Sequence, residues 1–325
     1  MNRASSDLCK LLGIERPVFQ AGMGFVTTGR IAGAVSAAGG LGCIATGGVM
    51  GTDELRDHIA HVRDVAPGRP FAVNLLLPSG ADDTSSTMGS LDFTRLQLDT
   101  CWEQKVPVII SGLGNPADII DEIHANDAKL VCVVGTVRAA LKVARAGADV
   151  VVLSGAEAGG HCGVVGTLSL AQAGIPQLRA LGVPVLLAGG MATAEAAAAA
   201  VALGAAGVSA GTRFLCSEES DAHERYKQVV VDAGERDTTV TRACTGKPSR
   251  AWRNAFVASW EGRESELQPY PEQAVENLWR GYAGAVEGDL EEGFFPMGQC
   301  AAAIDRVLPA AEVVDLLARP AEAAA

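Results

Sequence analysis

Short apolar runs alternate with longer helical patterns over the first 234 residues, and this alternation is the feature that most constrains the fold. Eight runs are predicted as strands, at 17–20, 41–45, 71–75, 106–111, 129–133, 149–153, 183–187 and 207–210. Helices are predicted after them, at 29–38, 53–65, 91–103, 116–125, 137–146, 173–181, 193–203 and 220–232. The strand runs are continuously apolar, which is typical of parallel strands buried on both faces.

Eight βα units in series predict an α/β fold of the (β/α)8 TIM-barrel type. A doubly wound open sheet is the competing architecture, and the count of eight favours the closed barrel.

The pattern changes after residue 234, where aromatic and charged residues become dense. We interpret 1–234 as the cofactor-binding barrel and 235–325 as a mainly helical C-terminal segment that packs across the barrel mouth on the substrate side. The polar stretch 77–90 follows the third predicted strand, and we expect it to form a flap near the site.

Charge and cysteine content exclude several classes of protein. A net charge of −12 argues against binding to nucleic acid or to an anionic membrane surface. The longest low-charge stretch, 191–211, is interpreted as a packed helix followed by a strand, and the N-terminus does not resemble a secretory signal. The eight cysteines form no CxxC pair, which predicts reduced thiols in a cytoplasmic protein and no metal site.

Four glycine-rich clusters directly follow predicted strands. Glycine lets a ligand approach the backbone closely, and backbone N–H groups after the seventh and eighth strands of a TIM barrel can bind phosphate without a lysine. Thr212 can add a hydroxyl donor, whereas Arg213 either binds phosphate or pairs with Glu218 or Glu219. The clusters are Ala21-Gly22-Met23-Gly24, Ala158-Gly159-Gly160-His161, Ala188-Gly189-Gly190-Met191 and Ala210-Gly211-Thr212-Arg213.

His161 is the candidate catalytic residue. It lies in the stretch 154–163, SGAEAGGHCG, just after the sixth predicted strand, and active sites of TIM barrels lie at the carboxyl ends of the strands. An imidazole there can exchange protons with a bound substrate. We interpret the adjacent Cys162 as a small residue beside the site rather than a catalytic thiol.

Polar residues at other strand ends are candidates for ring contacts. The Asn74 amide can both donate and accept, which suits the edge of a heterocycle such as a flavin pyrimidine ring. Ser111 and Ser154 occupy corresponding positions, and the alternative for all three is a turn residue with its polar groups satisfied locally. The GxGxxG fingerprint is incomplete after Gly24, so a Rossmann dinucleotide site is disfavoured.

With these motifs the chain resembles the nitronate monooxygenase (2-nitropropane dioxygenase) family, whose superfamily includes FMN-dependent enoyl-acyl-carrier-protein reductases. The resemblance extends over nearly the whole chain. It is carried by RPVFQAGMG, FAVNLLLP, RAGADVVVLSGAEAGGHCG, VPVLLAGGM, AAGVSAGTRF, TGKPSRAWRNAF and MGQCAAAIDRVLPAAE.

The resemblance implies FMN as cofactor, with its phosphate on Gly189-Gly190 and Gly211-Thr212. The ring is then expected against Gly22-Met23-Gly24, with Asn74 near the pyrimidine edge and His161 in the family's histidine role. The family often has proline where Gly22 stands, and glutamine or glutamate where Ser154 stands. Similar proteins are commonly homodimers.

The expected reaction is oxidation of a small-molecule alkyl nitronate, or a nitroalkane, by FMN and dioxygen to a carbonyl compound and nitrite. The alternative is NAD(P)H-dependent reduction of an activated double bond, such as an enoyl thioester. A third hypothesis, a non-enzymatic flavin-binding barrel, is disfavoured by the histidine in its glycine loop.

Overall fold

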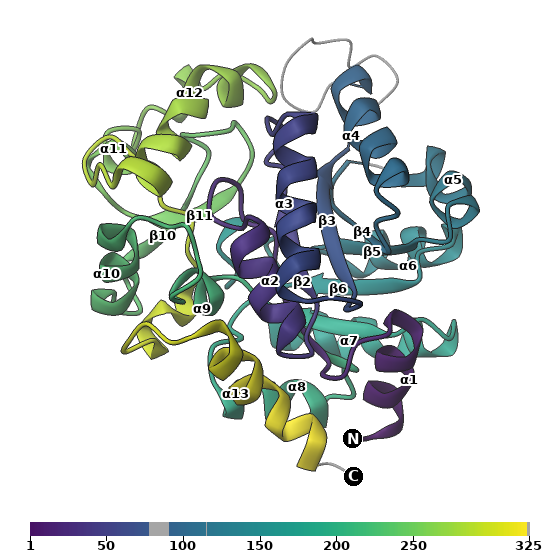
Figure 1. Ribbon diagram of the computed structural model, residues 1–325. Coiled ribbons are helices and arrows are strands. Elements are labelled where there is room, and N and C mark those ends of the chain that lie inside the picture. Colours follow the sequence, from purple (N-terminus) through teal and green to yellow (C-terminus); the bar gives the residue numbers. More distant parts are fainter. Residues whose placement is uncertain (78–90, 115, 324–325) are drawn as a thin grey trace.

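The computed structural model describes residues 1–77, 91–114 and 116–323 (Figure 1). Apart from Leu77, the stretch predicted as a flap lies outside the described residues.

A closed barrel of parallel strands forms the centre of the molecule. One sheet has the strand order β1-β9-β8-β6-β5-β4-β3-β2. A parallel bridge between Phe19 and Leu41 joins β1 to the residue before β2, so the two ends of this order meet. The prediction of a (β/α)8 TIM barrel is therefore confirmed, and each predicted strand is present. The strands are β1 (Val18–Gln20), β2 (Gly42–Ala45), β3 (Phe71–Leu76), β4 (Val108–Leu113), β5 (Lys129–Val134), β6 (Val150–Ser154), β8 (Val185–Ala188) and β9 (Gly207–Ala210).

Successive side chains of a barrel strand point alternately to the interior and to the helix layer. On β6, Val152 packs in the interior cluster and Val151 in the outer cluster that the helices cover. The helix α1 (Arg3–Leu12) contributes Leu8 and Leu12 to the interior cluster and closes one end of the barrel. The carboxyl ends of the strands lie at the opposite end of the barrel, and that end can hold an active site.

Helices between the strands form the outer layer, as predicted. Three of them have threonine N-caps: the hydroxyls of Thr28, Thr136 and Thr193 accept hydrogen bonds from backbone N–H groups of the first turn. No helix in the described ranges combines the length and apolar character needed to cross a membrane. The helices are α2 (Gly29–Ala37), α3 (Thr52–Val65), α4 (Leu91–Glu103), α5 (Ile120–Ala125), α6 (Val137–Ala146), α7 (Thr167–Ala180) and α8 (Ala194–Ala202), with a 3₁₀ turn at Pro116–Asp118.

Helix α7 begins at Thr167, six residues earlier than the sequence indicates. Its N-cap is Gly166, whose side chain cannot cap the helix. The carboxylate of Glu157 supplies the missing acceptor from the preceding loop, at 2.8 and 3.1 Å from the Thr167 backbone nitrogen. Because this cap lies ten residues upstream in the sequence, local signals do not show the helix start.

The C-terminal part of the chain builds a second, small sheet with a piece of the barrel. The antiparallel order is β10-β11-β7, and β7 belongs to the loop after β6. None of these three strands was predicted. The elements are β7 (Gly160–His161), α9 (Thr212–Leu215), α10 (Glu224–Asp232), β10 (Thr238–Thr241), β11 (Ser249–Trp252), α11 (Ala255–Ala258), α12 (Glu272–Tyr282), a π-helical turn at Ala283–Glu287, and 3₁₀ turns at Glu264–Glu266 and Gln299–Ala303.

The last helix, α13 (Ala310–Ala323), returns to the outside of the barrel (Figure 1). It packs between α8 and α2, where a (β/α)8 barrel needs its eighth helix. By contrast, α10, the longer of the two helices between the last barrel strand and β10, packs on the 3₁₀ turn at Gln299–Ala303.

Candidate active site

One large cavity opens at the carboxyl ends of the barrel strands, with a volume of about 370 Å³. Cofactor and ligand pockets of proteins are typically of this size or larger. The predicted site residues that line it come from β3, from the end of β6 and from the segments that follow β1, β6, β8 and β9. They are Ala21, Gly22, Met23, Gly24, Asn74, Ser154, Gly159, Gly160, His161, Gly189, Gly190, Met191, Gly211 and Thr212.

Ser111 is the predicted residue that the structure does not bring to this cavity. It shares a strand face with Ile109, which packs in the outer cluster, whereas Ile110 and Gly112 line the cavity. The Ser111 hydroxyl is buried and lies 3.5 Å from the Leu113 carbonyl oxygen. Position at a strand end was therefore not sufficient, because the alternation of side chains decides which residues face inward.

His161 is held in the small sheet rather than on a free loop. As part of β7, it pairs with Ser249 of β11 in antiparallel register. Its Nε2 atom lies 2.9 Å from the Oγ1 atom of Thr245, which also lines the cavity. The C-terminal segment therefore fixes both the backbone and the ring of the candidate catalytic residue.

The environment of His161 keeps its imidazole neutral. The His161 side chain is exposed, because it opens to the cavity rather than into the core. Partial desolvation by the surrounding protein, together with the positive charge of Lys247, lowers the pKa of His161 from 6.5 to about 4. At neutral pH the ring can accept or donate a hydrogen bond and carries no charge.

Glu157 anchors the loop that carries His161. Besides the backbone contacts to α7, its carboxylate accepts a hydrogen bond from the Thr167 hydroxyl at 2.8 Å, and its carbonyl accepts one from the Gln299 backbone at 3.0 Å. The backbone of Gly159 lies close to the C-terminal segment, because a Cβ on this residue would lie 2.6 Å from the Met297 carbonyl carbon. The EAGGH sequence thus fits between α7 and the C-terminal segment, a role of Glu157 that the sequence did not reveal.

Glycines after β8 and β9 make a cradle at one end of the cavity. Gly189 and Gly190 have φ angles of 92° and 84°, which favour glycine, and a Cβ on Gly190 would meet no atom within 4 Å. The Thr212 hydroxyl accepts a hydrogen bond from the Gly298 backbone at 2.9 Å. Cys300 also lines this end: burial raises the pKa of its thiol, and hydrogen bonds with Thr212 and the Gly190 backbone act in the opposite direction.

The ends of β1 and β3 place the Asn74 amide beside the backbone of Gly22. A Cβ on Gly22 would lie 2.8 Å from the Cβ of Asn74, so only glycine leaves room for this asparagine. The Asn74 amide nitrogen donates to the Ile110 carbonyl at 3.2 Å. Ser154, at the end of β6, is largely buried and lines the same cavity.

Arg213 follows neither of its two predicted roles. Its guanidinium is buried and donates to the carbonyl oxygens of Cys216 and Arg306, each at 2.6 Å. Glu219 instead accepts a hydrogen bond from the Ala310 backbone at the start of α13. Arg213 therefore joins α9 to the C-terminal segment.

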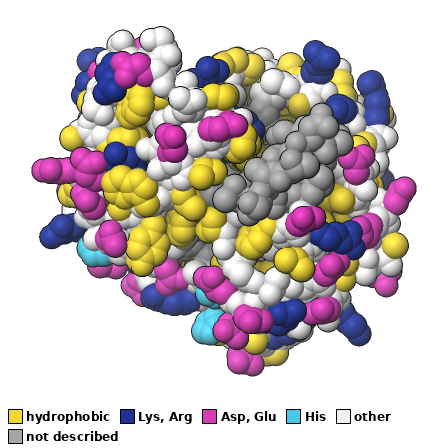
Figure 2. All heavy atoms as spheres, turned by 90° about the horizontal axis from the view of Figure 1, so that it is seen from above, with side chains coloured by type: hydrophobic (Ala, Val, Ile, Leu, Met, Phe, Trp, Pro, Cys, Tyr) yellow, Lys and Arg dark blue, Asp and Glu magenta, His cyan; other side chains and the backbone are white. Residues whose placement is uncertain are grey.

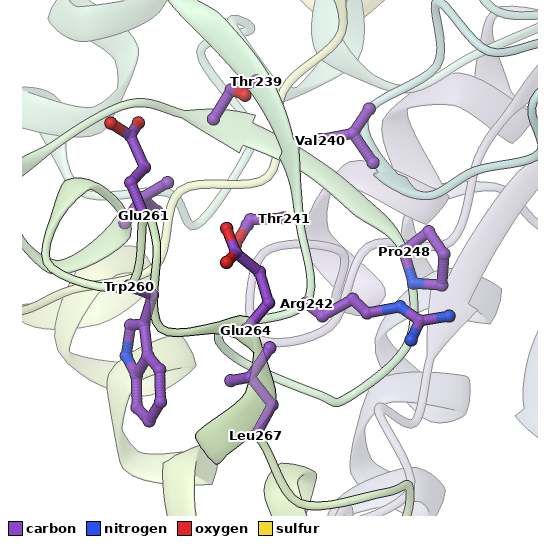
Figure 3. A pocket seen from close by; sticks show the side chains of 10 residues that line it. Thr239, Val240, Thr241, Arg242, Pro248, Trp260, Glu261, Glu264 and Leu267 are labelled. Carbon is purple, nitrogen blue, oxygen red and sulfur yellow. The ribbon is translucent and has the colours of Figure 1, made fainter.

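A second pocket, of about 290 Å³, lies along β10 (Figure 3). The carboxylates of Glu261 and Glu264 lie along it, and none of the predicted site residues lines it. The larger cavity, which the predicted site residues do line, is therefore the candidate active site. The remaining lining residues are Thr239, Val240, Thr241, Arg242, Pro248, Val257, Trp260 and Leu267.

Comparison with known proteins agrees with this geometry. The family model described as "Nitronate monooxygenase" matches residues 5–319. The chain belongs to the nitronate monooxygenase family. It is 33% identical over 301 residues to a probable nitronate monooxygenase of Staphylococcus aureus, covering 82% of this chain and 83% of that protein.

Solved structures of similar proteins share the fold over almost their whole length. FabK from Thermotoga maritima has a TM-score of 0.85 and 39% identity, covering 98% of this chain and 96% of that chain. Nitroalkane oxidase from Streptomyces ansochromogenes has a TM-score of 0.83 and 30% identity, covering 98% and 99%. As a member of the nitronate monooxygenase family, the protein is a flavin-dependent oxidoreductase.

Proposed function

We propose that the protein binds FMN and uses dioxygen to oxidise alkyl nitronates to a carbonyl compound and nitrite. The observation that carries the proposal is that one cavity contains both a glycine cradle suited to a phosphate and the neutral imidazole of His161. In this proposal residues 1–234 hold the cofactor, and the segment 235–325 supplies the wall on the substrate side.

The cradle fits the phosphate of FMN. Gly190 presents open space instead of a side chain, and the loops of Gly189-Gly190 and Gly211-Thr212 both reach the same end of the cavity. Backbone N–H groups and the Thr212 hydroxyl would hold the phosphate, as in other phosphate sites that lack a lysine.

The part of the cavity next to this cradle fits the flavin ring. Gly22, Met23 and Gly24 offer backbone to a flat ligand, and Asn74 offers an amide to the polar edge of the ring. Gly159 and Gly160 continue this surface toward His161. When bound, the flavin supplies the redox chemistry, and the protein supplies position and electrostatics.

The low pKa of His161 favours nitronates over neutral nitroalkanes as substrates. An imidazole whose conjugate acid has a pKa of about 4 is a weak base, so it removes a proton from a nitroalkane α-carbon slowly. A nitronate is already deprotonated and needs a hydrogen bond to its nitro oxygens. His161 in its neutral form can donate that bond.

A second candidate function is the NAD(P)H-dependent reduction of an activated double bond. The observation that favours it is the apolar wall that the C-terminal segment adds to the cavity, which suits an acyl chain. The same cavity and the same histidine would serve that reaction.

The proposal is tested on the purified protein in two steps. Heat-released cofactor is separated and identified, and FMN is the expected species; FAD or no flavin would contradict the proposal. The holoenzyme is then given ethyl nitronate in air-saturated buffer. Oxygen consumption together with nitrite release supports the proposal, and the absence of both overturns it.

A further inference from the structure

We propose that the cavity wall formed by Phe25 and one face of α12 is the subsite for the hydrocarbon chain of the substrate. The enzyme would then act best on nitronates with a long, unbranched alkyl chain and no second charge. This inference rests on the proposed function, because it names the substrate class of the same cavity.

One face of α12 lines the cavity at helical spacing. Ala274, Leu278 and Gly281 all face the cavity, and Ala285 continues the row in the π-helical turn that follows. Their small or aliphatic side chains make an apolar surface without a polar group. A π-helical turn is uncommon, and it is frequently found at functional sites.

The opposite face of the same helix is exposed. Val275 and Trp279 are 42% and 50% exposed, and neither lines the cavity. Seen from above, hydrophobic side chains gather on the side of the molecule where α12 lies (Figure 2). The helix therefore carries two apolar faces, and only the inner one can contact a ligand in the cavity.

Phe25 completes the wall from the loop after β1. Its φ of 66° is unfavourable for a residue with a bulky side chain, and such strain is often found at ligand sites. The ring packs on Gly281, where a Cβ would lie 3.2 Å from the Phe25 Cε2 atom. It also meets Tyr282 edge to face, with centroids 6.0 Å apart. These contacts hold the ring in place as part of the wall.

The described lining of the cavity contains no Asp, Glu, Lys or Arg. Two polar side chains of the lining are engaged within the protein: the Tyr226 hydroxyl donates to the Pro296 carbonyl at 2.6 Å, and the Cys244 thiol lies 3.9 Å from the Asn277 carbonyl oxygen. A carboxylate at the far end of a substrate would lose its water and find no cation on this wall. The subsite therefore fits a plain hydrocarbon chain.

The test measures kcat/KM of the holoenzyme with the nitronates of nitroethane, 1-nitrobutane, 1-nitrohexane and 1-nitrooctane. We expect a rise of about two- to fourfold per methylene until the wall is filled, the upper value being that of full burial. The nitronate of 6-nitrohexanoate, in which a carboxylate replaces the terminal methyl group, is expected to be at least about tenfold poorer than that of 1-nitrohexane. Equal values along the series would overturn the subsite.

Two variants locate the effect on this wall. Gly281→Val adds bulk to the cavity wall at its contact with the Phe25 ring, so the loss of kcat/KM relative to the wild type should grow with chain length. Leu278→Ala removes contact area without adding bulk, and it should flatten the same series if Gly281→Val fails to fold. The matched control is Val275→Ala on the exposed face of α12, for which the chain-length series should match that of the wild type. An equal flattening in the control would contradict the assignment.

A binding measurement separates this inference from the proposed function. Straight-chain alkanols of increasing length are titrated into the flavin-loaded protein, and the change in flavin absorbance reports binding without turnover. If affinity rises with length while no nitronate is oxidised, the subsite stands and the proposed function fails. If nitronates are oxidised but neither affinity nor kcat/KM depends on length, the proposed function stands and the subsite fails.

Discussion

The Nε2 atom of His161 lies 2.9 Å from the hydroxyl oxygen of Thr245, although 84 residues separate them in the sequence. This contact connects the glycine loop of the barrel to the C-terminal segment. It also fixes the orientation of the imidazole, because a ring nitrogen engaged by a neighbour cannot turn freely.

Loss of this hydrogen bond should reduce activity without removing the cofactor. Thr245→Val keeps the shape of the side chain but removes the hydroxyl. We expect kcat/KM for ethyl nitronate to fall about five- to tenfold, as for the loss of roughly 1 kcal/mol. Thr245→Ser restores the hydroxyl and should recover most of the activity. Equal losses in the two variants would show that the methyl contact matters and the hydrogen bond does not.

Removing the imidazole should affect the two substrate forms differently. In His161→Ala we expect retained flavin and a loss of about 10²-fold in the turnover of neutral nitroalkanes, which need a base; this is the lower end of the range for general-base catalysis, because the imidazole is a weak base. The loss with preformed nitronates should be smaller, because no proton has to be removed. Steady-state rates with nitroethane and with ethyl nitronate measure the difference. Turnover of nitroethane at the wild-type level would refute the assigned role.

The lowered pKa of His161 also predicts the pH profile. A pKa of about 4 means that the imidazole is neutral throughout the neutral range. Activity that depends on the neutral ring should be constant between about pH 6 and 8 and fall as pH drops through about 4. In His161→Ala this acidic limb should disappear. A limb near pH 6.5 in the wild type would show that the ring titrates as in water.

The free energy of unfolding should also depend on the protonation of His161. Because the pKa is lower in the folded than in the unfolded chain, the unfolded chain binds more protons between about pH 4 and 6.5. The contribution of His161 to the free energy of unfolding therefore rises with pH across this window. Denaturant titrations of the wild type and His161→Ala at several pH values measure it, and an opposite slope would contradict the pKa shift.

The glycine cradle gives a prediction with a close internal control. Gly190 and Gly182 have φ angles of 84° and 76°, and a Cβ on either would meet no atom within 4 Å. Both Gly→Ala variants should lose about 1–2 kcal/mol of stability, the cost of a left-handed conformation for a residue with a Cβ. Only Gly190→Ala places its methyl group in the cavity, so it alone should weaken FMN binding. Equal affinity of the two variants for FMN would contradict the placement of the phosphate at this cradle.

The barrel could be predicted from the sequence because its strands are largely apolar runs separated by helical patterns, as at Val150–Ser154. The small sheet could not. Its strand β7 is only Gly160–His161, and β10 reads as four polar or β-branched residues in a charged region. These strands form because the C-terminal part of the chain returns to the barrel mouth and pairs with β7 there. Such long-range pairing leaves no local signal in the sequence.

Prediction of the site had a similar limit. Clusters of glycine at strand ends located the cavity, whereas Ser111 was selected without regard to the face of its strand. Thr245 was missed because it reaches His161 from a distant segment, and Glu157 because its partner is the end of a helix. The position of α13 beside α2 likewise depends on tertiary packing.

Anaerobic mixing of the flavin-loaded protein with substrate tests the central claim most directly. The holoenzyme is mixed in a stopped-flow instrument with ethyl nitronate or, separately, with NADH or NADPH, and the flavin absorbance is followed. We predict rapid bleaching by the nitronate and no response to either nicotinamide. Rapid bleaching by NADH or NADPH, with no response to the nitronate, would contradict nitronate oxidation and favour the reductase.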